Sequence, residues 1–186
     1  MLVSYNGLVK LVEDGVLTNV SLDMINAASI DITLGGVFYV ERKPAGIERN
    51  YVILSDDPLM RRPPNMDRIE LAVGETLTLG PGEVVLAQSQ QVFNLPSDLS
   101  AEYKEKSSMG RVFLNHMMAG WCDAGWNGSV LTLELKNELK HHSTIIPVGV
   151  RIGQMIFHQH EPVPREASYA QKGRYNGDTE TKGMKP

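Results

Sequence analysis

The sequence predicts a mainly β domain, a sandwich or a barrel, with one helix at its N-terminal end. Short β-branched or alternating runs recur between clusters of Gly, Pro, Asn and Asp from about residue 29 to residue 158, as in strands joined by tight turns. No long helical pattern lies between these runs, which favours a sandwich or barrel. The 186 residues are enough for one domain with a core that needs no metal or disulfide.

The N-terminal helix is the clearest element. Ser4 can cap it, apolar residues at three- and four-residue spacing form one face, and Gly15 suits its end. Residues 55–67 contain three prolines and are expected to form a surface loop. The expected strands cover residues 29–34, 37–41, 51–54, 68–72, 75–79, 84–93, a run ending near 105, 112–116, 130–136, 142–146 and 151–158.

Composition and charge limit the functions that this chain can have. Eighteen Lys and Arg against 22 Asp and Glu give a formal net charge of −4, which disfavours non-specific nucleic-acid binding. The single cysteine, Cys122, excludes an intramolecular disulfide and any site with two Cys ligands from one chain. No long apolar stretch or cleavable signal pattern is present. We therefore expect a cytoplasmic protein without membrane or nucleic-acid partners.

Motifs of the common cofactor chemistries are missing. The sequence has no GxxxxGK[ST] phosphate loop, no GxGxxG dinucleotide motif and no GxSxG nucleophile turn. It also has no HxE with PCxxC, the ligand pattern of zinc nucleobase deaminases. His158 and His160 lie two apart on an expected strand, where a polar strand edge explains them better than a metal site.

Three local patterns carry chemistry. Residues 104–111, KEKSSMGR, could gather N–H groups, hydroxyls and a lysine at the start of a helical turn at Ser107, which suits phosphate oxygens; an ordinary capped turn with solvated lysines is the alternative. Residues 119–128, AGWCDAGWNG, form a loop with two tryptophans, which must pack or stack on something. Residues 132–137, TLELKN, alternate as a strand, and Glu134 could act as a base if its face closed a pocket.

The last 22 residues differ from the rest of the chain. Residues 165–186 hold five Lys or Arg, three acids and three glycines, with little to bury. A frayed terminus is one interpretation, and a basic, flexible flap that orders over an anionic ligand is the other. We expect a domain over residues 1–164 followed by such a flap over residues 165–186.

Taken in order, these patterns resemble the dCTP deaminase branch of the trimeric dUTPase-like family. The matching segments are KSSMGR (106–111), AGWCDAGWNG (119–128), TLELKN (132–137), PVGVRIGQMIF (147–157), INAASIDITLG (25–35) and LGPGEVVLAQS (79–89). In the tail, GRYNGDT (173–179) is similar to the segment that closes over the triphosphate, although Asp178 stands where the family commonly has glutamine. The resemblance implies a distorted β-barrel or jelly roll, assembled as a homotrimer with sites between subunits.

The resemblance also implies roles for individual residues. Glu134 is expected to shuttle protons while water attacks C4 of cytosine. The residues expected beside it are Ser107 and Arg111, which hold the water and offset charge, the backbone carbonyl of Ala119, and His116. The residues expected to bind the nucleotide are Lys106, Ser108, Asp123, Trp126, Tyr175 and Lys182. Mg²⁺ is expected to arrive on the triphosphate, and no zinc or other protein-held metal is expected.

The resulting hypothesis is hydrolytic deamination of dCTP to dUTP and ammonia, which supplies dUTP for thymidylate synthesis. A dUTP pyrophosphatase is the first alternative, alone or as a second activity of the same site, because Asp123 matches the aspartate that activates water in that branch. A non-catalytic nucleotide-binding regulator with the same fold is the second alternative. TTP is a candidate inhibitor.

Overall fold

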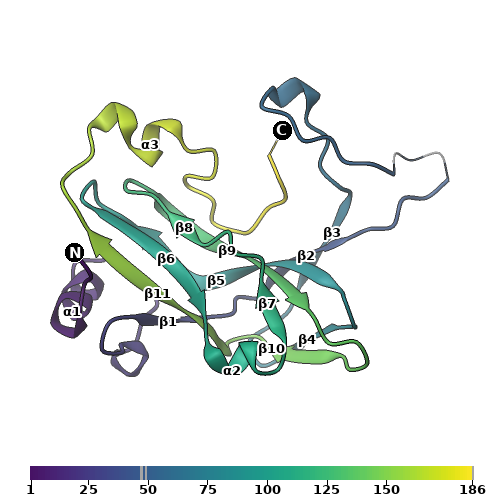
Figure 1. Cartoon of the computed structure of the whole chain (residues 1–186), viewed down its shortest axis with the longest axis horizontal. Helices are drawn as coiled ribbons and strands as arrows, with labels where there is room; N and C mark the ends of the chain where they lie inside the picture. The colour runs from purple at the N-terminus through teal and green to yellow at the C-terminus, as the bar shows by residue number, and fades with distance from the viewer. Residues whose placement is uncertain (47, 49, 186) are drawn as a thin grey trace.

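The protein is described by a computed structural model, which covers residues 1–46, 48 and 50–185. Figure 1 shows two larger antiparallel sheets and a small one, with the N-terminal helix outside them. The prediction of a mainly β fold with an N-terminal helix is confirmed. The strand orders describe two open sheets packed as in a jelly roll, not one closed barrel.

The first sheet has four strands in the order β1-β11-β6-β8, and the second has five in the order β3-β2-β5-β9-β7. The strands of the first are β1 (Ile30–Thr33), β11 (Arg151–Gln159), β6 (Leu99–Glu105) and β8 (Trp121–Cys122). The strands of the second are β3 (Met66–Glu70), β2 (Val37–Glu41), β5 (Val84–Asn94), β9 (Asn127–Asn137) and β7 (Leu114–His116). The third sheet pairs β10 (Thr144–Pro147) with β4 (Thr76–Leu79).

The core lies between the two larger sheets. Leu133 and Leu135 of β9 are fully buried, as are Val85 and Ala87 of β5, opposite which they pair. Since successive side chains of a strand point to opposite faces, Thr132 and Glu134 lie on the other face of β9. That face is where a pocket can form.

The helices are short. α1 (Tyr5–Glu13) begins after Ser4 and buries Leu8, although the Ser4 side chain makes no capping hydrogen bond in the described structure. Gly15 ends this segment with a φ of 73°, which glycine adopts at little cost. The other helical segments are η1 (Leu22–Met24), η2 (Pro58–Met60), α2 (Ser107–Gly110), η3 (Arg165–Ala167) and α3 (Tyr169–Lys172).

The strand predicted over residues 51–54 is wrong. In the described part of this region, Ile53 forms one isolated bridge with Arg62 and the ladder does not continue. Residue 64 would be the next residue on this side to donate a ladder hydrogen bond, and it is a proline, which has no N–H. Residues 50–62 instead form an extended loop that includes η2.

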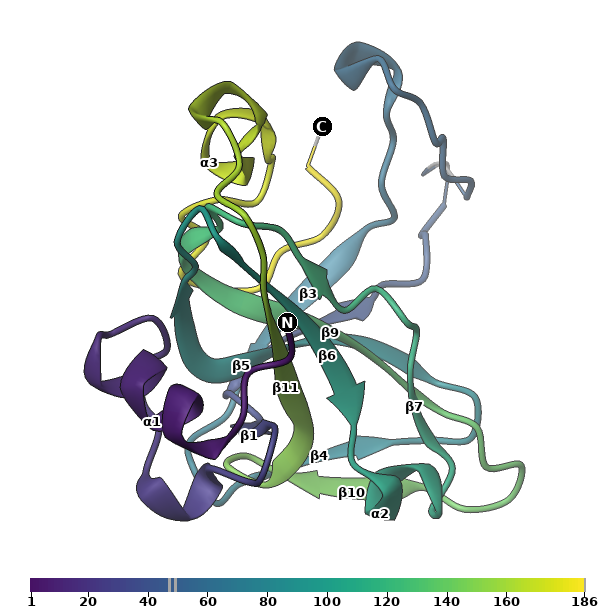
Figure 2. The same cartoon turned by 60° about the vertical axis from the view of Figure 1, so that its left-hand side comes forward.

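The C-terminal segment lies against the second sheet, as Figures 1 and 2 both show. The N–H of Val130 donates to the carbonyl of Asp178 at 2.9 Å, and the N–H of Gly177 donates to the carbonyl of Asn127 at 3.0 Å. The hydroxyl of Thr181 is 3.0 Å from that of Thr132, and Thr181 is fully buried. The segment thus covers the face of β9 that carries Glu134.

Candidate active site

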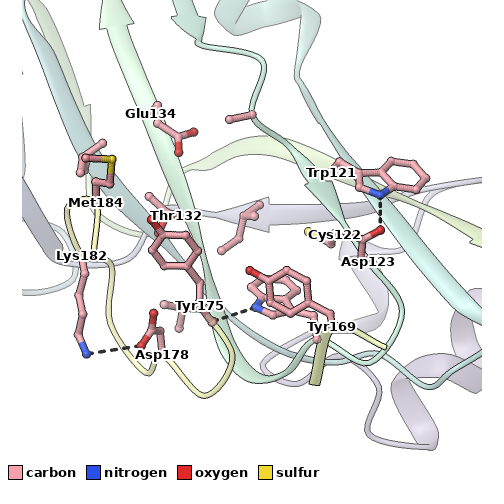
Figure 3. Close-up of a pocket in the computed structure, with 15 residues that line it drawn as sticks. Trp121, Cys122, Asp123, Thr132, Glu134, Tyr169, Tyr175, Asp178, Lys182 and Met184 are labelled. Atoms are coloured by element: carbon pink, nitrogen blue, oxygen red, sulfur yellow. Dashed lines mark hydrogen bonds and ion pairs between the residues drawn. The ribbon is translucent and has the colours of Figure 1, made fainter. Parts of the chain in front are cut away.

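A pocket of about 370 Å³ lies between β9, the loop before it and the C-terminal segment. We call it the active-site pocket. Figure 3 shows Glu134 at one end of it and Asp178 and Lys182 at the other. Its charged residues are Asp123, Glu134, Asp178 and Lys182, and its other lining residues include Ala119, Trp121, Trp126, Thr132, Tyr169, Tyr175 and Met184.

Glu134 is the carboxyl best placed for proton transfer. Strand alternation points it away from the core, and β7 pairs with β9 so that His116 lies opposite Leu135, the next residue. The Glu134 Oε2 atom lies 3.1 Å from His116 Nε2. Neither atom makes a hydrogen bond of good geometry to any described residue. Because Oε2 is buried, a water bound in the pocket would meet the exposed part of the Glu134 side chain, and an ionised carboxyl there can accept a proton from it.

Behind His116 lies a cluster of buried polar groups. The rings of Tyr103 and His116 lie 4.6 Å apart, and the Tyr103 hydroxyl and Glu105 Oε1 are also buried without a hydrogen bond among the described residues. Burial raises the pKa of Glu105, and the charge and backbone N–H of His116 oppose this rise. Burial, followed by the charge of Glu105, raises the pKa of Tyr103. His116 therefore lies between the pocket carboxyl and a second, partly buried one.

The two tryptophans of the loop have different roles. Trp126 stacks on Phe93 with the ring centroids 5.1 Å apart, and its Nε1 donates to the carbonyl of Tyr175 at 3.2 Å. Trp121 is 57% exposed, and its Nε1 donates to Asp123 Oδ1 at 2.8 Å. Trp126 thus joins the core to the C-terminal segment, whereas Trp121 orients Asp123.

Gly125 sets the path of this loop. Its φ is +87°, and a Cβ atom there would lie 1.9 Å from the Ser168 hydroxyl oxygen. A residue with a Cβ atom would be strained at this φ, and either the loop or the Ser168 side chain would have to move.

Asp178, at the end of the pocket opposite Glu134, binds the last two lysines of the chain, Lys182 and Lys185. Its carboxylate lies 2.7 Å from the Lys185 ammonium and 3.5 Å from that of Lys182. Lys185 also lies 5.2 Å from the centroid of the Tyr175 ring. Asp178, where the resemblance predicts a glutamine, therefore places a counter-charge beside the predicted phosphate ligand Lys182.

The KEKSSMGR segment lies elsewhere. A helical turn does begin at Ser107, as the sequence predicts, but α2 lies at the end of the molecule opposite α3 and the tail. Lys106 binds the buried Asp31 at 2.6 Å, and Arg151 reaches the same carboxylate at 3.4 Å. Ser107, Ser108 and Arg111 are exposed.

The structure of one chain therefore brings together some of the predicted residues and not others. Glu134, Ala119, Asp123, Trp126, Tyr175 and Lys182 line one pocket, with His116 directly behind Glu134. Lys106, Ser107, Ser108 and Arg111 are not among the residues that line it. Sequence reasoning missed Tyr169 and Met184 in the pocket and Tyr103 and Glu105 behind it. The only signal was the alternation of Tyr103 and Glu105 on one face of β6.

Among the described residues, no group of three or more His, Cys, Asp or Glu side chains is arranged to hold a metal ion. A Mg²⁺ ion that arrives on a triphosphate takes most of its ligands from phosphates and water. The pocket carboxylates of Asp123 and Glu134 are compatible with such an ion. In the described part of the chain, no helix has the length and apolar character needed to span a membrane.

Comparisons with known proteins agree with these patterns. A family model described as dCTP deaminase-like matches residues 3–160. A relative from Rhodococcus erythropolis named "dCTP deaminase, dUMP-forming" is 37% identical over 133 residues, which are 71% of this chain and 66% of the relative. A relative from Nocardia farcinica with the same name is 34% identical over 158 residues, or 83% of this chain and 75% of the relative.

Among solved structures, the 2′-deoxycytidine 5′-triphosphate deaminase from Agrobacterium tumefaciens has a similar fold. It aligns with a TM-score of 0.63 and 18% identity over 90% of this chain and 51% of that chain. The chain spans just under two thirds of the length of the Rhodococcus relative and about half of the Agrobacterium chain.

Proposed function

The chain belongs to the dCTP deaminase-like family, and we propose that it replaces the 4-amino group of dCTP with an oxygen from water and releases ammonia. The observation that carries this proposal is Glu134, whose side chain lines the active-site pocket while one of its oxygens, Oε2, is buried 3.1 Å from His116 Nε2. A deaminase that uses no metal-bound hydroxide needs one group to accept a proton from water and to return it to the leaving amine. We assign both roles to Glu134.

The proposed reaction has three steps. The Glu134 carboxylate takes a proton from water while the water oxygen attacks C4 of cytosine, and the π electrons of the N3–C4 double bond move to N3. Protons then pass through Glu134 to the ring nitrogen and the exocyclic nitrogen. Finally the bond between C4 and the exocyclic nitrogen breaks, ammonia leaves and a carbonyl forms at C4. The carbonyl of Ala119 orients the water, and the His116 ring packs against the Glu134 carboxyl. Mg²⁺ bound to the triphosphate would neutralise part of the phosphate charge.

We further propose that the site is completed by a second copy of the chain. Ser107 and Arg111 are exposed on α2, away from the pocket of their own subunit. In a cyclic homotrimer each subunit can present α2 to the pocket of its neighbour. Arg111 would then offset the charge that develops around Glu134, and Ser107 would hold the attacking water.

A second candidate reaction concerns the product. The carboxylate of Asp123 lines the same pocket as Glu134 and is oriented by Trp121. Together with the relatives named dUMP-forming, this favours hydrolysis of the dUTP intermediate to dUMP and pyrophosphate, with Asp123 activating the water. The two reactions would then run in one pocket in sequence.

The test is to incubate the purified protein with dCTP and excess Mg²⁺ and to separate dCTP, dUTP and dUMP over time. Accumulated dUTP supports deamination alone, and dUMP with pyrophosphate supports the two-step reaction. Glu134→Gln should abolish both products, while Asp123→Asn should convert a dUMP-forming protein into one that accumulates dUTP. Binding of dCTP without any product would favour the non-catalytic alternative. A zinc-selective chelator should leave the rate unchanged, and added TTP tests inhibition.

A further inference from the structure

Trp121 lines the active-site pocket from the first sheet, and the pairing of three strands sets its position. Trp121 of β8 lies opposite Glu102 of β6. On the other side of β6, His158 of β11 lies opposite Ser100. Ser100 and Glu102 are two positions apart on one strand, so their side chains point to the same face. Trp121 and His158 therefore lie on that same face of the sheet, diagonally across β6.

The Trp121 and His158 rings stack on each other. Their centroids lie 6.2 Å apart, and the ring planes differ by 29°, within the range of stacked aromatic pairs. Trp121 is exposed, and β8 is a two-residue strand at the edge of its sheet. An exposed side chain in such a place exchanges readily between rotamers. The His158 ring, which is carried by the nine-residue strand β11, restricts this exchange.

Trp121 in turn fixes the carboxylate of Asp123. Its Nε1 donates to Asp123 Oδ1 at 2.8 Å, as the dashed line in Figure 3 shows. Asp123 is exposed, and among the described residues no other side chain binds its carboxylate. Hydrogen bonds to charged groups are the stronger ones, so the indole N–H selects one orientation of the carboxylate. Oδ2 then remains as the oxygen that can accept a proton.

Glu134 does not depend on this arrangement. It lies on β9 in the second sheet, and its neighbour there is His116 of β7. In the described part of the chain, no hydrogen bond or ring contact joins Glu134 to Trp121 or His158. A change in the Trp121 N–H or in the His158 ring should therefore alter chemistry at Asp123 and leave chemistry at Glu134 intact.

We propose that Trp121 and His158 are positioning residues for the dUMP-forming reaction, in which they hold the Asp123 carboxylate toward the attacking water. This inference rests on the second reaction of the proposed function. In that reaction the water oxygen bonds to the α-phosphorus of dUTP, and one water proton passes to Asp123 Oδ2. The bond from the α-phosphorus to the bridging oxygen breaks, and the leaving pyrophosphate takes up the proton. The two rings thereby set how much dUTP is released before it is hydrolysed.

The first experiment compares Trp121→Phe with the wild type. Phenylalanine keeps a ring in the pocket and removes the N–H donor. With dUTP as the substrate, kcat should fall about tenfold, because a hydrogen bond to a charged group is lost, while KM changes less than about twofold. With dCTP as the substrate, the rate of ammonia release should stay within about twofold of the wild type, and dUTP should accumulate. An unchanged kcat for dUTP would overturn the proposal.

The second experiment uses His158→Ala and His158→Phe as a matched pair, because phenylalanine keeps a ring that can stack on Trp121 and alanine does not. We expect His158→Ala to lower kcat for dUTP about threefold and His158→Phe to change it less than about twofold. Equal losses in the two variants would overturn the role of His158. The thermal midpoint of unfolding checks that each variant is folded.

The same assays separate this inference from the proposed function. Formation of dUMP that needs Asp123, together with a fully active Trp121→Phe, would keep the proposed function and overturn the inference. An equal fall of ammonia release and dUTP hydrolysis in Trp121→Phe would also overturn it, since Trp121 would then shape the whole pocket. Slowed dUTP hydrolysis in Trp121→Phe without any ammonia release from dCTP would contradict deamination and keep the inference. A wild type that never forms dUMP would contradict the second reaction and the inference together.

Discussion

The predicted site residues lie at two ends of the molecule, one set in a pocket and the other exposed to solvent. At the pocket end, Glu134 and Asp123 face a cavity that the C-terminal segment of the same chain covers. At the α2 end, Ser107 and Arg111 face solvent. The residues that the family resemblance assigns to one reaction are thus separated within one chain. Under the proposal that a second copy completes the site, folding builds one half of it and assembly of subunits builds the other half.

The lysines predicted to bind phosphate are paired with carboxylates at both ends of the molecule. Lys106 is bound to Asp31, whose side chain is 3% exposed, and Lys182 is bound to Asp178, whose side chain is 12% exposed. Each lysine that the sequence predicts to bind phosphate is therefore paired with a carboxylate before any ligand binds. An anion must compete with these carboxylates at either end, and the pair at Asp31 is the more buried one.

The largest effect should come from the pocket end alone. Glu134→Gln keeps the shape of the side chain and removes the proton acceptor, so the deamination rate should fall by a factor on the order of 10² to 10⁴. Steady-state rates with dCTP measure this, and calorimetry should show that dCTP still binds. Turnover close to that of the wild type would exclude Glu134 as the base.

The second prediction tests whether residues from the two ends of the molecule meet in one site. Arg111→Gln should also be nearly inactive, because its charge would be missing from the neighbouring pocket. Mixing unfolded Arg111→Gln and Glu134→Gln chains and refolding them together should restore roughly a quarter of the wild-type rate, since sites between subunits can combine two intact halves. Mixtures as inactive as the separate variants would show that the two residues do not meet across a subunit boundary. Refolded wild-type protein is the control.

A smaller effect is expected from Asp178→Asn. The amide keeps the size of the side chain but releases Lys182 and Lys185, so dCTP should bind a few times more tightly because free ammonium groups attract phosphate. Deoxycytidine, which has no phosphate, should bind as it does to the wild type. Equal dCTP affinities in variant and wild type would show that Lys182 does not reach the phosphates. Glu180→Gln, in the same segment, is the control.

The smallest effect concerns Glu105 and stability. Because burial raises the pKa of Glu105 above 4.5 in the folded protein, the folded state binds this proton more tightly than the unfolded chain. The wild type therefore loses stability as the pH rises from 4.5 through the folded pKa, whereas Glu105→Gln cannot ionise. The midpoint of the variant relative to the wild type should therefore rise as the pH increases from 4.5 through the folded pKa of Glu105. Glu102→Gln, which removes a surface partner of Lys104 on the same strand, should not show this rise.

The sequence by itself determined the secondary structure where local pattern and burial agree. Period-two alternation placed Glu134 opposite Leu133 and Leu135 on β9, and the spacing of apolar residues predicted α1, because side-chain direction along a strand or helix follows from local backbone geometry. Local pattern failed at residues 51–54, whose β-branched residues find one bridge and no ladder. A strand needs a neighbouring strand to pair with, and the sequence of the segment alone does not specify one.

Only the tertiary structure decided which charges meet. Asp178 and Lys182 are near in sequence, but the pairing of Lys106 with Asp31 spans 75 positions, and that of His116 with Glu134 depends on the register of β7 against β9. The buried cluster behind His116 likewise appears only once the chain is folded. Electrostatic interactions depend on distance and burial in space, whereas the sequence specifies only the order of the groups along the chain.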